Sequence, residues 1–278
     1  MAGMKRARRR TIAGLATLVA LLLLLVLNAT PVLLIVRQAL ATAAESTAWP
    51  LRWIPESLTV RNLAEVWSTQ NLGANFVLSV WVAFLTTVLV LIIGAPAAWA
   101  AARYSRMAAT SVRAAVVSRV LPPIAIALPL ASALIGIGLY DQPLGGGLIL
   151  AHAVYTLPVV ILVLYAGFRG LPLELEEAAH VDGCSVWSGF VRIALPASRG
   201  TLATAALLVF LLSWDEFTYA LLIQLTHRTM PPLIYYYSQY GELGAASTLA
   251  LVMLLPSALV IGALQRLVTA GSMEGFGR

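Results

Sequence analysis

Six apolar stretches, each long enough to cross a lipid bilayer as an α-helix, dominate this chain of 278 residues. A membrane-spanning helix needs about 20 mostly apolar residues to cross a hydrocarbon core about 30 Å thick. The stretches cover residues 11–36, 76–102, 114–139, 148–168, 201–225 and 246–267. Prolines in or near several of them predict kinks, since neighbouring helices can satisfy the freed backbone groups. The sequence therefore predicts an all-α membrane protein with six transmembrane helices.

The composition agrees with a bilayer environment, because 60% of the residues are hydrophobic and only 11% are charged. An ordinary soluble domain has about 25% charged residues. The net charge of +6 would suit nucleic acid in a soluble protein, but here the basic residues lie at the ends of apolar stretches without interleaved aromatic residues. No nucleic-acid partner is predicted.

The basic residues also predict an orientation, because Lys and Arg are retained on the cytoplasmic side of a membrane. With the N-terminus inside, all but four of the 18 basic residues fall in cytoplasmic segments. The exceptions are Arg37, Arg52, Arg61 and Arg228. We expect a basic cytoplasmic N-terminus at 1–10, a six-helix domain at 11–268 with an external loop at 40–75, and a cytoplasmic tail at 269–278. A cleaved signal peptide is the alternative for the first stretch, but its apolar region would usually have only about 7–15 residues.

Motifs for ATP binding, metal binding and hydrolysis are absent from the sequence. Lys5 is the only lysine, and no glycine-rich loop is followed by Lys and Ser or Thr, as a phosphate-binding loop would be. His152, His180 and His227 lack the spacing to a carboxylate that metal sites use. The single cysteine, Cys184, excludes an intrachain disulfide. The chain is predicted to be neither an enzyme nor a metalloprotein.

A charged loop at residues 169–199 interrupts the apolar pattern between the fourth and fifth stretches. Its first half predicts a short helix from Leu173 to Val181. Pro172 suits the first helical position, and Gly183 suits the left-handed residue that ends a helix. A helix of about ten residues is marginal in water, so it needs a surface to pack against.

An apolar stripe with helical spacing runs along this predicted helix. The stripe consists of Leu171, Leu175, Ala178 and Ala179. Glu174, Glu177 and His180 lie away from it. The stripe could dock onto the chain's own membrane domain or receive a cytoplasmic partner, and helix physics alone favours neither alternative.

The same loop resembles the coupling-helix signature of the permease subunits of bacterial ABC importers. That signature has Glu-Ala-Ala, three residues, Gly, nine residues, Ile, one residue and Leu-Pro. The chain matches it without a gap at Glu177, Ala178, Ala179, Gly183, Ile193, Leu195 and Pro196. The resemblance implies a type I ABC importer permease fold with both termini inside, and it assigns coupling to an ATPase subunit to these positions and to Asp182.

Other stretches are similar to carbohydrate-uptake permeases, in particular to the second, maltose-type subunit. Residues 210–217 resemble that subfamily's Trp-Asn-Glu/Asp-Phe stretch, and residues 265–275 resemble its tail. Asp215 departs from the pattern, because Asn is usual there, and this departure bears on the charge of the substrate. The resemblance covers nearly the whole chain and implies an importer for a sugar or oligosaccharide.

The resemblance further implies partners and a location. A second permease subunit would complete a heterodimer, two cytoplasmic ATPase subunits would bind ATP and Mg²⁺, and an extracytoplasmic protein would deliver the substrate. This chain itself would bind no cofactor. It would lie in the bacterial plasma (inner) membrane as a multi-pass protein surrounded by lipid.

Asp215 and Glu216 are paired carboxylates inside the fifth apolar stretch. An ionised group near the bilayer centre costs about 2.5–3.5 kcal/mol on insertion scales, so such groups usually face a cavity or a partner. They mark a candidate substrate pathway, to which Trp214, Tyr219 and Gln224 could add stacking or hydrogen bonds. The alternative is a structural role, in which one carboxylate pairs with the partner permease and holds the two subunits in register.

Two further functions stay open on the sequence alone. Asp215 would suit a cationic solute such as a polyamine, carried by the same kind of importer. A self-sufficient secondary transporter would need internally repeated halves with broken helices. The sequence shows no such repeat.

Overall fold

The computed structural model describes residues 2–69 and 72–275 of the chain. Side chains are described for residues 14–68, 72–104, 110 and 112–266. Parts of three predicted segments, the two termini and the external loop, lie outside the described residues. Within the described part of the chain the regular structure is entirely helical, which confirms the predicted all-α class.

The chain divides into two compact units. The first combines Met1–Gln70 with Ile234–Val252. Its helices are α1 (Ala2–Leu40), α2 (Ala43–Ser46) and α3 (Arg61–Thr69), with parts of α13 (Met230–Gln239) and α14 (Leu243–Gly275). Asn62 ties α3 to the end of α1, because its side-chain amide donates to the carbonyls of Ala39 and Ala41 at 2.8 and 3.0 Å. Two short helices thus lie in the described part of the predicted external loop, and Asn62 fixes the second of them to the end of α1.

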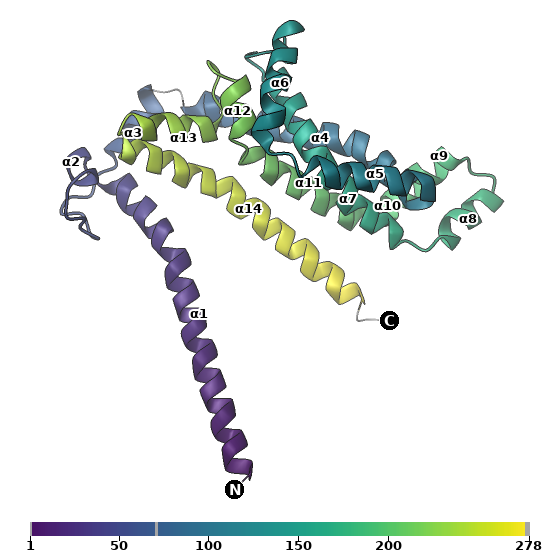
Figure 1. The fold of residues 1–278 in the computed structure, drawn as a ribbon, viewed down its shortest axis with the longest axis horizontal. Coiled ribbons are helices and arrows are strands. Elements are labelled where there is room, and N and C mark those ends of the chain that lie inside the picture. Colours follow the sequence, from purple (N-terminus) through teal and green to yellow (C-terminus); the bar gives the residue numbers. More distant parts are fainter. Residues whose placement is uncertain (1, 70–71, 276–278) are drawn as a thin grey trace. The chain divides into compact units, whose positions relative to one another are not determined.

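The second unit combines Asn71–Leu233 with Met253–Arg278. Its longest helices, α4 (Leu72–Arg103) and α7 (Gly146–Arg169), pack along each other and against α11 (Arg199–Trp214) (Figure 1). Gly94 allows α4 to approach α7 closely, since a Cβ at this position would lie 2.9 Å from Cγ1 of Val160. Buried side chains of all three helices form the main core, including Val90, Ala98, Trp99, Leu164, Phe168, Ala205 and Val209.

The predicted helix at 114–139 is not continuous, so that prediction is corrected. It is split into α5 (Ser105–Ser118) and α6 (Pro123–Gly136), and the two parts are bent by 97°. Pro122 and Pro123 explain the break, because proline lacks an N–H donor and disfavours helical backbone in the residue before it.

The predicted helix at 201–225 is also interrupted. The α11 helix ends at Trp214, and after a short break the chain continues as α12 (Thr218–Ile223). Before α11, the segment Val186–Ala197 is bent by 78° from it. Asp215 and Glu216 therefore lie in a break between two helices and not inside a regular one.

Four helices of the described chain are long and apolar enough to cross a membrane. They are Gly14–Leu40, Leu72–Arg103, Gly146–Arg169 and Leu243–Arg266, which overlap four of the predicted stretches. The number rises to six if each of the two bent pairs makes one span. The six-span topology stays a prediction.

Candidate functional site

The α8 helix (Glu174–Val181) carries the first part of the coupling signature. It begins one residue later than predicted, with Leu173 as its N-cap, so Pro172 lies just outside the helix. The correction is small, because the Leu173 carbonyl is the group that accepts the first helical hydrogen bonds. Gly183 ends the helix as predicted, with a left-handed φ of 84° and an N–H that donates to the His180 carbonyl at 3.0 Å.

A buried ion pair fastens α8 to the ends of α4 and α7. The Glu176 side chain is only 7% exposed, and its Oε1 accepts from Nε and Nη2 of Arg103 at 2.9 and 2.5 Å. Its Oε2 accepts from the indole N–H of Trp99 at 3.2 Å. Arg103 also donates through Nη1 to the Phe168 carbonyl at 3.1 Å. One guanidinium thus joins three helices with charge-assisted hydrogen bonds.

Sequence reasoning missed this anchor. Arg103 and Glu176 are separated by 73 positions, and no motif spacing relates them. One signal was present in the sequence. Glu176 lies one helical turn before Ala179, a residue of the predicted apolar stripe, and residues three apart are neighbours on a helix surface.

The apolar stripe predicted for this helix is buried only in part. Ala179 and Glu176 are buried, whereas Leu175 is 47% exposed. Glu177 and Ala178 of the signature are exposed as well. The helix therefore contacts its own unit through one small and one charged residue, and the described chain leaves an apolar and acidic face uncovered.

The remaining signature residues, Ile193, Leu195 and Pro196, follow α9 (Val186–Gly189) in a π-helical turn (Phe190–Ala194) and in α10 (Leu195–Ala197). Phe190 anchors this turn, since its buried ring lies 5.0 Å from the ring of Trp99 and 6.3 Å from that of Phe168. Both halves of the loop thus pack at one corner of the core. Figure 1 shows α8 and α9 together at one end of this unit.

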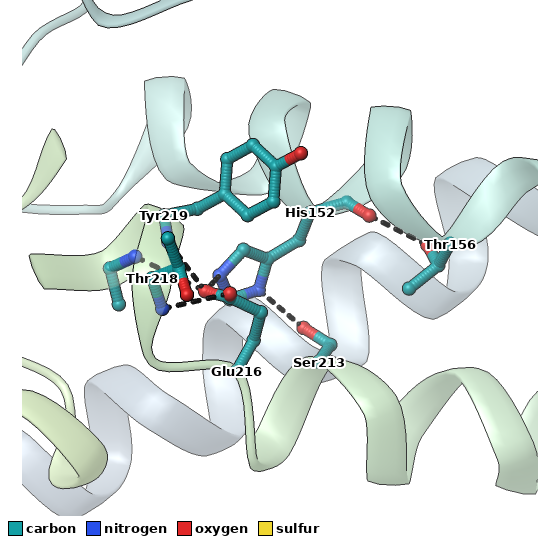
Figure 2. Close-up of polar contacts among 7 residues, drawn as sticks. His152, Thr156, Ser213, Glu216, Thr218 and Tyr219 are labelled. Carbon is teal, nitrogen blue, oxygen red and sulfur yellow. Dashed lines mark hydrogen bonds and ion pairs between the residues drawn. The ribbon is translucent and has the colours of Figure 1, made fainter. Parts of the chain in front are cut away.

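A second buried polar cluster lies at the break between α11 and α12 (Figure 2). Glu216 is 8% exposed, and its Oε1 accepts from the N–H of Thr218 at 2.9 Å. Its Oε2 accepts from the N–H groups of Tyr219 and Ala220 at 2.9 and 3.2 Å. The first N–H groups of a helix have no partner within it. The carboxylate therefore caps α12 and offsets the positive end of its dipole.

His152 on α7 joins the same cluster, as Figure 2 shows. Its Nδ1 lies 2.7 Å from Oγ of Ser213, and its Nε2 lies 3.4 Å from Oε2 of Glu216. The imidazole is 1% exposed. It connects α7 to Ser213 at the end of α11 and to Glu216, which caps α12, in the interior of the protein. The sequence presented His152 only as a scattered histidine, although an ionisable residue inside an apolar stretch is itself a signal. No group of three or more possible metal ligands occurs among the residues that the structure describes.

Asp215 differs from its neighbour in exposure. Both residues line a pocket of about 610 Å³, but Asp215 is exposed whereas Glu216 is buried. The pocket is bounded by side chains of α6, α7, α11, α12 and α14, and most of them are apolar. An open carboxylate in an apolar pocket can accept hydrogen bonds from hydroxyl groups or attract a cation.

The other predicted pathway residues are buried. Trp214 donates through its indole N–H to a carbonyl of α14 at 3.3 Å, and Gln224 donates to the Gln142 carbonyl at 2.6 Å. Tyr219 is fully buried. Among the predicted pathway residues, Asp215 is thus the one with an exposed side chain, and substrate contact by the others stays a prediction.

Comparisons with known proteins agree with these features. Residues 91–271 match the family described as the binding-protein-dependent transport system inner membrane component. The sulfoquinovosyl glycerol transport system permease protein SmoH of Agrobacterium fabrum is 31% identical over 268 residues, which cover 92% of this chain and 91% of SmoH. The trehalose transport system permease protein SugB of Mycobacterium tuberculosis is 32% identical over 244 residues, which cover 85% of this chain and 88% of SugB.

A solved structure supports the fold. A bacterial ABC transporter involved in the import of the acidic polysaccharide alginate contains a chain that matches with a TM-score of 0.71, over 92% of this chain and 96% of that one. Their sequence identity is 16%, so this likeness concerns the fold alone. The chain thus belongs to the binding-protein-dependent transport system inner membrane components, a family of multi-pass permease subunits that work with ATPases and substrate-binding proteins and are not themselves enzymes.

Proposed function

We propose that this chain is a permease subunit of an ATP-driven importer for a sugar or oligosaccharide and forms half of the translocation pathway. The observation that carries the proposal is α8, which exposes Glu177 and Ala178 of the signature while a buried ion pair holds it to the bundle. Relatives named for sulfoquinovosyl glycerol, trehalose and alpha-glucoside transport support a sugar as the substrate.

Energy from ATP enters through α8 in this proposal. The chain lacks a phosphate-binding loop, so ATP and Mg²⁺ would bind to separate ATPase subunits. The distribution of basic residues favours a cytoplasmic position for the loop at 169–199 and for both termini. An ATPase that displaces α8 would displace α4 and α7 with it, because Arg103 bonds to Glu176 and to the Phe168 carbonyl.

The complex that we propose has four kinds of subunit. A second permease would complete a heterodimer and the pathway, and two ATPases would bind at the cytoplasmic loops. A substrate-binding protein outside the plasma membrane would supply the solute. The test is reconstitution in proteoliposomes with these partners: uptake of a sugar should require ATP and the binding protein, and uptake by this chain alone would contradict the proposal.

Charge reversal at Glu177 should uncouple the complex without unfolding the permease. Because Glu177 is exposed, Glu177→Lys should leave the melting temperature unchanged while it lowers ATP-driven uptake by about tenfold, which corresponds to about 1.4 kcal/mol of lost docking energy. Glu65→Lys is the matched control, since Glu65 is an exposed acid of α3 in the predicted external loop. Equal uptake by both variants would rule out contact between Glu177 and an ATPase.

A cationic solute is a second candidate, favoured by the exposed carboxylate of Asp215 in its pocket. Asp215→Asn keeps the shape of the side chain but removes its charge. For a cation such as a polyamine, we expect uptake to fall by about tenfold or more, since a charge-assisted contact is lost. For a neutral sugar, we expect a change of less than about threefold, because Asn still accepts hydrogen bonds. Uptake measured with both solutes decides between the two candidates.

A further inference from the structure

A separate pocket of about 290 Å³ lies beside the break between α5 and α6. It is formed by the break, by the middle of α7 and by α12. Its polar lining includes Ser118, Arg119, Tyr155 and Tyr219. It adjoins the Asp215 pocket, because Pro123 and Tyr155 line both.

Arg119 offers this pocket a guanidinium that makes a single hydrogen bond to the described residues. The group stacks on the ring of Tyr155, 4.9 Å from its centroid, and donates one long hydrogen bond of 3.4 Å to the Tyr155 carbonyl. A guanidinium carries five N–H donors. Stacking fixes the plane of the group and leaves its N–H edge available for a flat or branched acceptor.

Tyr219 supplies a second unused donor. Its ring is fully buried, and among the described residues its hydroxyl has no hydrogen-bond partner. A buried hydroxyl without a partner is unfavourable, so an acceptor in the pocket would stabilise it. The hydroxyl of Ser118 is already committed, because it donates to the Ala115 carbonyl at 2.9 Å.

The charges around the two pockets differ in sign. No carboxylate is among the described residues that line the Arg119 pocket, whereas Asp215 and Glu216 line the neighbouring one. The Arg119 pocket combines a guanidinium, a phenol hydroxyl and an aromatic ring, and no carboxylate among its described lining residues competes for the guanidinium. These features are typical of an anion site. The adjoining Asp215 carboxylate can accept hydrogen bonds from hydroxyl groups attached to the same molecule.

We propose that the Arg119 pocket binds the anionic group of a small molecule, a carboxylate, sulfonate or phosphate, while hydroxyl groups of that molecule reach the Asp215 pocket. Two sources share this chemistry: an acidic sugar on its way through the importer, and the headgroup of an anionic lipid. The acidic-sugar source rests on the proposed function. The binding itself is independent of it and can be measured on the full chain without its partners.

The experiment uses the full chain in nanodiscs of phosphatidylcholine, with D-glucuronate and D-glucose as probes that differ in one carboxylate. Calorimetry or ligand-detected NMR should show glucuronate binding more tightly than glucose. Arg119→Gln should weaken glucuronate binding by about tenfold, because the charge-assisted contact is lost. Tyr219→Phe should weaken it by a smaller factor while the ring and the fold are retained. Arg113→Gln is the control, since Arg113 is an exposed arginine of α5 outside the pocket.

A second set of nanodiscs, which also contains phosphatidylglycerol, tests the lipid source. Native mass spectrometry should then find phosphatidylglycerol retained by the wild-type chain and by Arg113→Gln but lost from Arg119→Gln. Selective glucuronate binding supports the solute source, and selective lipid retention supports the lipid source. If Arg119→Gln changes neither, the proposal is wrong, whatever uptake the assembled complex performs. If binding is seen but the reconstituted complex imports no sugar, the proposed function fails and the anion site stands.

Discussion

Replacement of Arg103 by glutamate is expected to abolish ATP-driven uptake. Glu176 is buried, and its Oε1 accepts from two N–H groups of Arg103. The substitution would place two carboxylates together at the corner where α4, α7 and α8 meet. Removal of one partner of a buried ion pair typically costs about 3–5 kcal/mol, because the other charge is left uncompensated. We expect α8 to detach from the bundle, so the reconstituted complex should hydrolyse ATP without transport.

Three variants separate this uncoupling from simple misfolding. Arg61→Glu makes the same change of net charge at an exposed arginine of α3 in the predicted external loop, and it should transport normally. Arg103→Lys keeps the charge but loses the planar set of N–H donors of the guanidinium. This variant should fold and show a lower ratio of uptake to ATP hydrolysis. The double variant Arg103→Glu/Glu176→Arg should recover part of the uptake. Normal coupling in Arg103→Glu would exclude the ion pair as a link in energy transfer.

The sequence was a good guide to those parts of the chain where local signals determine the structure. The four uninterrupted spans followed from long apolar runs. The α8 helix followed from its position in the loop and from Gly183, whose left-handed backbone is adopted more readily by glycine than by other residues. In both cases the residues that determine the element lie within it or directly beside it.

The breaks in the other two predicted helices show where local signals are insufficient. Pro122 and Pro123 were visible in the sequence, but prolines are also tolerated inside membrane helices, so the 97° bend did not follow from them. The break that follows Trp214 is held by Glu216, which caps α12, and by His152 from another helix. The contact with His152 exists only once the helices have packed.

The candidate sites also contain some residues that local sequence signals identify and others that depend on the packing of distant segments. The signature in the loop identified the exposed residues of α8 directly, whereas its anchor needs Arg103, which is remote in sequence from Glu176. Likewise, the sequence marked Asp215 and Glu216 as an unusual pair but gave them equivalent roles. Both line the same pocket, but the structure separates them, since Asp215 is exposed there and Glu216 is buried and caps α12.

This separation leads to the second large effect: Glu216→Ala should strongly destabilise the permease, and Asp215→Ala should not. Loss of the Glu216 carboxylate leaves the N–H groups of Thr218, Tyr219 and Ala220 without their acceptor, and it removes the partner of His152. Buried groups left unsatisfied cost about 1–3 kcal/mol each before relaxation, so we expect a net loss of roughly 2–4 kcal/mol. The melting temperature in detergent should fall by roughly 5–15 °C.

The adjacent carboxylate is the natural control for this measurement. Asp215 is exposed, so Asp215→Ala should change the melting temperature by little, and any effect should be found in uptake. Glu216→Gln should lie between the two alanine variants, because its amide oxygen can still accept from part of the helix end. If Glu216→Ala and Asp215→Ala melt alike, the cap does not hold the α11–α12 break. In that case Glu216 would return to the role that the sequence first suggested, a second carboxylate of the substrate pathway.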